Sequence, residues 1–267
     1  MIRDITIGQY YKADSVIHRL DPRVKLMGTL IFIISLFMGM NIWIYAVVTV
    51  ALAVVIKMSK IPIKFMVRGL KSIVILIIIS AVFNLFLTPG DVLIQIWKLT
   101  ITYQGLKMAI FMVVRLIYLI VGTSLMTLTT TPNNLTDGLE KGLGFLKVIK
   151  VPVHEIAMMM SIALRFIPIL IEETDKIMKA QMARGADFEN GSLIKRAKAM
   201  VPILVPLFVS AFRRANELAM AMEARCYHGS EGRTKMKPLK YEKRDRIAYI
   251  SMVLYLGVII IVKIIVA

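Results

Sequence analysis

Two arginines at matching positions are the residues of this chain best suited to specific recognition chemistry. They stand in Met182-Ala183-Arg184-Gly185 and in Met222-Glu223-Ala224-Arg225-Cys226, two similar segments. An arginine at a helix end is always charged and presents a planar fork of donors. It can hold a carboxylate or backbone carbonyls of a partner for roughly 1.5–3 kcal/mol per charge-assisted hydrogen bond. The small alanine beside each arginine lets such a partner approach closely.

Ordinary helix capping explains the same residues in another way. A basic side chain in the last turn suits the helix dipole, and glycine is the usual residue just past a helix end because it adopts positive φ without strain. A single ending of this kind is best interpreted as a cap. Two similar endings in one block leave capping and partner binding both open.

Two helical stretches must position these endings. Residues 154–182 are predicted to form a helix kinked at Pro168, and Gly185 stands where a capping glycine stands. Residues 187–192 are predicted to form the connecting loop. A second helical stretch covers residues 193–225, and Pro202 and Pro206 predict two helices that meet at an angle. The polar residues 228–246 are interpreted as a solvated linker.

The composition is that of an integral membrane protein. The 267 residues are 58% hydrophobic with a mean hydropathy of +0.73, whereas soluble domains are about 45–50% apolar. The excess of 34 Lys+Arg over 17 Asp+Glu, a net charge of +17, indicates membrane topology first. We expect no nucleic-acid partner because no nucleic-acid-binding module is present. The single cysteine excludes an internal disulfide.

Four apolar regions predict five transmembrane helices. Residues 26–56 are long enough for two helices with a break at Asn41, and further spans are predicted at 72–88, 105–131 and 247–266. Asp21 and Pro22 look like the N-cap and first residue of the first helix. The expected organisation is therefore an N-terminal segment 1–25, four transmembrane helices in 26–131, a polar block 132–245 and a last span in 246–267.

The charges predict an orientation in the membrane. Residues 57–71 carry five basic and no acidic side chains, and with the spans as drawn they lie on the same side as 1–25 and the block 132–245. Because positive charge collects in the cytoplasm, we expect the N-terminus and the block to be cytoplasmic and the C-terminus to be outside.

Arg115 lies inside a predicted span. An intramembrane charge can mark a conduction or relay site. An isolated arginine that faces a polar gap or snorkels is the favoured interpretation, because no span offers a matching acid. This argues against a proton-coupled carrier.

Other chemistries have weak support in the sequence. Residues 142–147 lack the spacing and the Gly-Lys-Ser/Thr ending of a nucleotide-binding loop. His154-Glu155 lacks the second histidine of a zinc protease motif, and three histidines with one cysteine make a metal site improbable. A membrane enzyme acting on lipid through Arg115, Arg165 or Glu155, and a stand-alone channel or carrier, stay open as alternatives.

Three stretches together carry a family resemblance. They are the segment 14–26, with His18-Arg19-Leu20-Asp21-Pro22-Arg23; the segment 129–168, with Thr131-Pro132, Val151-Pro152 and Leu164-Arg165-Phe166; and the pair of Ala-Arg endings. In this order they resemble the transmembrane (T) component of energy-coupling factor (ECF) transporters, the EcfT family. These are vitamin importers related to ATP-binding cassette (ABC) transporters. The resemblance covers nearly the whole chain.

The resemblance implies an all-α integral membrane protein of the cell membrane, with about five transmembrane helices and a cytoplasmic domain of amphipathic coupling helices. It implies a non-catalytic scaffold for two ABC ATPase subunits and a substrate-binding S-component. ATP and Mg²⁺ would be held by the ATPases and no cofactor by this chain. The residues that would contact the ATPases are Ala183, Arg184, Gly185, Ala224, Arg225 and Cys226. Cys226 departs from the family pattern, which has glycine there, and because Arg225 is kept the resemblance still implies contact with an ATPase.

Overall fold

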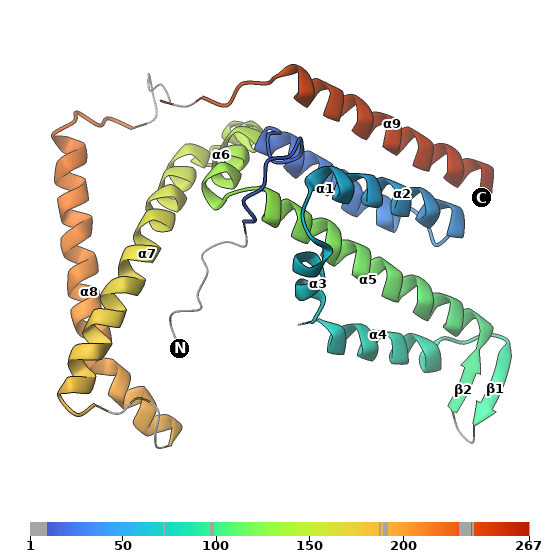
Figure 1. Ribbon diagram of the computed structural model, residues 1–267, viewed down its shortest axis with the longest axis horizontal. Coiled ribbons are helices and arrows are strands. Elements are labelled where there is room, and N and C mark those ends of the chain that lie inside the picture. Colours follow the sequence, from blue (N-terminus) through green and yellow to red (C-terminus); the bar gives the residue numbers. More distant parts are fainter. Residues whose placement is uncertain are drawn as a thin grey trace. The chain divides into compact units, whose positions relative to one another are not determined.

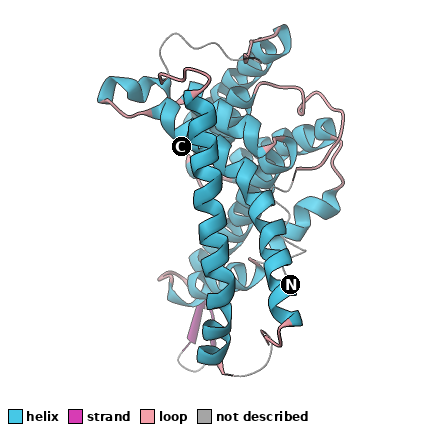
Figure 2. Cartoon of the chain, turned by 90° about the vertical axis from the view of Figure 1, so that its left-hand side faces the viewer, coloured by secondary structure: helices cyan, strands magenta, loops and turns pink. Residues whose placement is uncertain are grey.

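The chain is helical apart from one short strand pair (Figure 2). The computed structural model describes residues 10–71, 73–96, 99–186, 188, 192–229, 236 and 238–266. In these residues the elements are α1 (Pro22–Phe37), α2 (Ile42–Ser59), α3 (Ile63–Lys71), α4 (Val74–Leu87), β1 (Val92–Ile96), β2 (Leu99–Thr102), α5 (Tyr103–Thr129), α6 (Pro132–Gly142), a 3₁₀ helix (Gly144–Ile149), α7 (Val153–Ala183), α8 (Leu193–Glu223) and α9 (Lys243–Val266). The prediction of an all-α membrane protein is confirmed.

The described residues divide into two compact units. One holds residues 139–238, and the other holds 10–138 together with 239–266. The sequence analysis placed the polar block at 132–245. The first unit begins seven residues later, at 139, and ends seven residues earlier, at 238. We refer to the first as the tip unit and to the second as the helical unit.

Four helices are long and apolar enough to cross a membrane: α2, α5, α7 and α9. The pair α3 and α4, bent by 64°, would make a fifth span. Helix α1 has 16 residues, fewer than the roughly 20 of a typical span. Helix α7 meets the length and composition criterion although the sequence analysis placed it in the polar block, because its first half is mostly apolar.

Local capping explains where the predicted helices begin. Asp21 accepts a hydrogen bond from the Arg23 N–H at 2.9 Å, and Pro22 follows as the first helical residue, as predicted. Asn41 caps α2 in the same way through the Trp43 N–H at 3.3 Å. The predicted break in residues 26–56 therefore separates two real helices.

The antiparallel strands β1 and β2 were not predicted. They connect α4 to α5, and the paired residues include Ile96 with Leu99. Thr102 ends the pair and caps α5 by accepting from the Gly105 N–H at 3.0 Å.

The core of the helical unit lies among α1, α2, α5 and α9, which run side by side (Figure 1). One buried cluster joins α2 to α5, and a second joins α1 and α2 to α9 through residues such as Leu36, Val48 and Ile259. Gly122 permits the closest approach in this core. A Cβ there would lie 2.3 Å from the Phe32 ring, so α1 and α5 can pack only with glycine at this position.

Arg115 is buried in this core by packing and one hydrogen bond. Its Nε donates to the Tyr45 hydroxyl at 3.0 Å, and its guanidinium lies 5.0 Å from the Phe37 ring centre. Among the described residues it forms no ion pair. The described contacts of Arg115 are therefore made with two aromatic side chains, Tyr45 and Phe37.

Two helix tips with the same cap

The first Ala-Arg ending is the C-terminal cap of α7. Helix α7 ends at Ala183, and Gly185 has a φ of +88°. The Gly185 N–H donates to the Met182 carbonyl at 2.9 Å, and the next N–H donates to the Gln181 carbonyl at 3.0 Å. This bond pair is a Schellman cap, which satisfies two carbonyls that a helix end otherwise leaves open. The chain turns away just after Arg184, which therefore stands at the tip.

The second ending repeats this cap bond for bond. The Cys226 N–H donates to the Glu223 carbonyl at 2.8 Å, and the Tyr227 N–H donates to the Met222 carbonyl at 3.1 Å. Cys226 adopts a φ of +55°, the left-handed conformation that Gly185 adopts at the first tip. The replacement of glycine by cysteine has therefore not changed the path of the chain after Arg225.

Both tips are exposed and carry an available cation. Ala183, Arg184, Gly185, Ala224, Arg225 and Cys226 are all exposed. Within the described part of the chain, neither Arg184 nor Arg225 forms an ion pair. Each guanidinium thus sits at the negative end of a helix dipole with its donors directed to solvent or to a partner.

One ion pair lies midway between the two tips. Arg214 of α8 donates to Glu173 of α7 at 3.0 Å, and the Tyr227 hydroxyl donates to the Met158 sulfur at 3.1 Å. These two contacts require the helices to be antiparallel, and Figure 1 shows the tips at opposite ends of the pair.

The spacing of the tips follows from this ion pair. Arg184 lies 11 residues beyond Glu173, and Arg225 lies 11 residues beyond Arg214 in the opposite direction. At 1.5 Å per residue the two arginines are about 30 Å apart along the pair. Neither 11-residue arm contains proline. One small partner groove cannot accept both tips at this separation, so the arrangement suits two separate grooves.

Helix α8 is continuous, and the prediction of two helices was wrong. It runs unbroken through Pro202 and Pro206, and Figure 1 shows it changing direction along its length. Neither Pro202 nor Pro206 has a backbone N–H, so each removes one hydrogen bond of the helix. This loss permits the helix to bend without ending it. Residues 187 and 189–191 of the predicted connecting loop lie outside the described residues.

An apolar stripe runs along one face of α8. Its members are spaced for a single helical face and each is more than half exposed: Val201, Leu204, Val205, Phe208 and Phe212. We call these five residues the α8 stripe. The rings of Phe208 and Phe212 pack 5.0 Å apart. Such a contiguous exposed apolar face marks a surface for a protein or a membrane.

Two of the residues considered for a lipid-modifying enzyme, Glu155 and Arg165, lie far apart on the same helix. Glu155 and Arg165 are ten residues apart on α7, about 15 Å along the helix. Arg115 is held by Tyr45 and Phe37 in the helical unit. No group of three or more metal-binding side chains occurs among the described residues.

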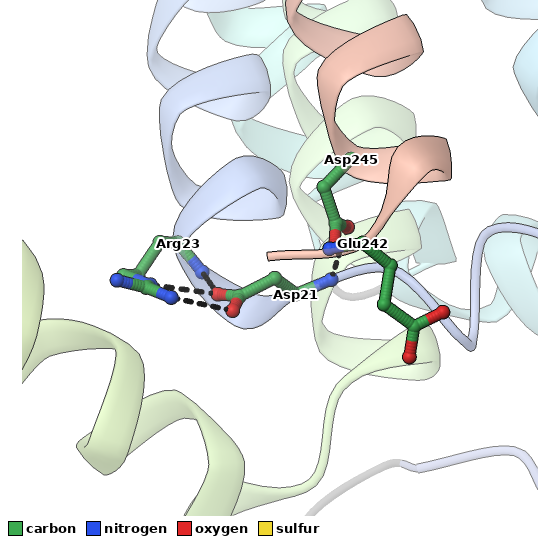
Figure 3. Close-up of polar contacts among 4 residues, drawn as sticks. All are labelled: Asp21, Arg23, Glu242 and Asp245. Carbon is green, nitrogen blue, oxygen red and sulfur yellow. Dashed lines mark hydrogen bonds and ion pairs between the residues drawn. The ribbon is translucent and has the colours of Figure 1, made fainter. Parts of the chain in front are cut away.

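The sequence reasoning missed a polar cluster at the start of α9. Asp245 is 2% exposed; it accepts from the Asp21 N–H at 2.9 Å and from the Glu242 N–H at 2.8 Å (Figure 3). The Asp21 carboxylate accepts hydrogen bonds from Nε and Nη2 of Arg23, at 3.0 and 2.8 Å. The Arg23 guanidinium stacks on the Tyr241 ring at 3.8 Å from the ring centre. This cluster joins the first and last helices of the helical unit. The predicted solvated linker is therefore fixed at its C-terminal end, while residues 230–235 and 237 lie outside the described residues.

Comparison with known proteins places these features in a family context. The sequence pattern of the CbiQ family, described as cobalt transport protein, matches residues 13–236. The energy-coupling factor transporter transmembrane protein EcfT of Clostridium kluyveri is 58% identical over 250 residues, which cover 93% of each chain. The proteins of the same name from Ruminiclostridium cellulolyticum and Bacillus subtilis are 54% and 47% identical over 245 and 254 residues, covering 92% and 95% of this chain and 92% and 96% of theirs.

Proposed function

Because the chain belongs to the family of energy-coupling factor transporter transmembrane proteins, we propose that it couples two ABC ATPases to a substrate-binding membrane subunit during vitamin uptake. ATP and Mg²⁺ would be bound by the ATPases, and this chain would transmit their movement without catalysing a reaction. The substrate-binding subunit would supply the selectivity for the vitamin.

The matched pair of tips is the observation that carries this proposal. Two identical caps present two free arginines about 30 Å apart at opposite ends of one helix pair. Such duplication suits a dimeric partner with one groove in each half. Each arginine would hold carboxylates or carbonyls in its groove, worth roughly 1.5–3 kcal/mol per charge-assisted bond.

The α8 stripe supports a second contact. An exposed apolar face between two charged tips suits a hydrophobic partner such as the membrane-embedded substrate-binding subunit. We propose that this subunit packs against the stripe while the ATPases hold the tips. In this arrangement α7 and α8 would carry movement from the tips to the membrane subunit.

The proposed contacts also require an orientation. ATPases act in the cytoplasm, so the tip unit and the N-terminus would be cytoplasmic and the C-terminus would lie outside. The basic segment 57–71, which runs from the end of α2 through α3, supports the same orientation because it carries five basic and no acidic side chains.

Charge reversal at the tips tests the proposal. The full chain carrying Arg184→Glu, Arg225→Glu or both is co-expressed with its ATPases and purified through a tag on this chain. Each single change should weaken ATPase binding about tenfold or more, since a favourable charged contact becomes repulsive. The double variant should lose both the ATPases and ATP-driven vitamin uptake, while the protein stays in the membrane.

Two exposed arginines away from the tips supply matched controls. Arg165→Glu on α7 and Arg213→Glu on α8 make the same charge change on the same helices and should leave ATPase binding intact. Unchanged uptake in the double tip variant would refute the assignment of the tips.

A further inference from the structure

A groove in the helical unit has the dimensions of one membrane leaflet. It encloses about 500 Å³ and is bordered by α1, α2, α5, α9 and the segment 16–20. Along α9 its lining runs from Arg244 to Tyr255, a helical rise of eleven residue steps, or about 16 Å. Half of a hydrocarbon core of about 30 Å has the same length.

Away from one end the lining of the groove is mostly apolar, and the hydroxyls of Thr29 and Ser251 there donate to carbonyls of their own helices. Side chains such as Ile31, Val54, Met126 and Met252 cover most of its length. The Tyr255 hydroxyl, at the far end, is already hydrogen-bonded to Ser35 at 2.7 Å. An occupant of this part must therefore be a hydrocarbon, because no free polar group is offered to it.

Two cations line the other end of the groove, Lys25 and Arg244. The Lys25 ammonium donates to the carbonyls of His18 and Thr129 at 3.1 and 2.8 Å, which leaves one of its three donors unassigned. Arg244 binds the exposed carboxylate of Glu242 at 2.9 Å through one nitrogen, and its buried Nε has no hydrogen-bond partner among the described residues.

Two carboxylates lie beside this end, and the hydrogen bonds described for them go to groups other than Lys25 and Arg244. Asp245 accepts two backbone N–H groups, and Asp21 is occupied by the Arg23 side chain (Figure 3). The groove end therefore presents cationic donors to its occupant. An apolar helix from another protein would leave these donors desolvated and unpaired, which is costly, whereas a phosphate would satisfy them.

We propose that this groove binds one anionic phospholipid of the adjacent leaflet, with its phosphate at Arg244 and Lys25 and an acyl chain along α1 and α9. Basic pockets between transmembrane helices are known to hold anionic headgroups. The proposal does not depend on ATPase binding, and the residues involved are separate from the two tips.

Lipid retention by the full-length protein tests this site. The purified chain is equilibrated with vesicles of equal parts phosphatidylcholine and phosphatidylglycerol, and the lipids that stay bound are identified by native mass spectrometry. The unmodified protein should retain phosphatidylglycerol in preference. Arg244→Gln should reduce that preference about tenfold, and Ala248→Phe, which fills the groove, should abolish retention of both lipids.

Matched variants on the same helix control for charge and bulk. Arg246→Gln removes a cation two residues away, and Ile250→Phe adds bulk on an exposed face; neither residue lines the groove. Both should retain phosphatidylglycerol normally. Equal loss in Arg244→Gln and Arg246→Gln, or no preference in the unmodified protein, would overturn the proposal. Loss of the lipid when the whole transporter assembles would assign the groove to a protein partner and also overturn it.

Discussion

At the scale of single residues, Cys226 shows how backbone conformation can persist without the residue that favours it. A non-glycine residue in the left-handed region costs about 1–2 kcal/mol, yet Cys226 keeps this conformation at a φ of +55°. Its N–H and that of Tyr227 complete the cap, so these bonds offset the strain. The position of Arg225 depends on hydrogen bonds that cysteine makes as well as glycine.

Replacing this cysteine should strengthen the second tip. Cys226→Gly relieves the strain and should stabilise the cap locally by about 1 kcal/mol, seen as slower amide hydrogen exchange at residues 226 and 227. The reciprocal control, Gly185→Ala, should accelerate exchange at residues 185 and 186 by a similar factor. If both changes left exchange unaltered, the left-handed conformation of the two caps would be contradicted.

At the scale of elements, the polar cluster at Asp245 fixes how α9 joins α1. The Asp245 carboxylate accepts from two backbone N–H groups. One belongs to Asp21, 224 residues away in the sequence, and the other to Glu242, three residues away. This carboxylate thus caps α9 and holds the residue that caps α1. Two helix beginnings depend on a single buried side chain.

Removing this carboxylate should loosen the helical unit. Asp245→Ala leaves the Asp21 and Glu242 N–H groups without an acceptor in a buried site, so the free energy of unfolding should fall by about 2–4 kcal/mol. Thermal unfolding in detergent measures this loss. Asp14→Ala, which breaks an exposed pair with Arg19, is the control and should change little. Equal effects of the two changes would show that Asp245 has no special structural role.

What the sequence predicts about these elements depends on how local the determining contacts are. Asp21-Pro22 and Asn41 identify helix starts because the capping bonds reach only two residues ahead. The role of Asp245 depends on contact with residue 21, which no local pattern indicates. The prolines of α8 suggested a break, but a bent helix tolerates two missing bonds when it packs on a neighbour, here through Arg214 and Glu173.

The candidate site shows the same division. The repeated Ala-Arg pattern predicted Arg184 and Arg225 as tip residues, since a helix end can be recognised from a few adjacent positions. Their separation of about 30 Å along the pair was not predictable, because it depends on where α7 and α8 pair. The equivalence of the two caps also required the structure, because cysteine rarely adopts positive φ.

At the scale of the whole molecule, the tip unit leaves a contiguous apolar face of α8 exposed. The α8 stripe is exposed along about three turns, while Ile203, on the opposite face of α8, is only 5% exposed. In the proposed transporter this face would be covered by another subunit. The stability of the chain in isolation should therefore be lower than in the transporter.

Altering the stripe should separate the two proposed partners. Phe208→Gln removes an aromatic anchor and should weaken retention of the substrate-binding membrane subunit by about tenfold or more, with ATPase retention unchanged. Quantitative co-purification of both partners measures the two effects together. Met220→Gln, also exposed on α8 but off the stripe, should alter neither, and an equal loss in both variants would argue against the stripe as the contact.

The cap at the second tip also makes the protein a natural reporter of its own assembly. The chain contains one cysteine, and its thiol is exposed beside Arg225. A maleimide dye will therefore label this tip alone, without any engineered residue. The labelling rate of the native protein, with and without the proposed ATPase partners, then measures directly how often the tip is covered.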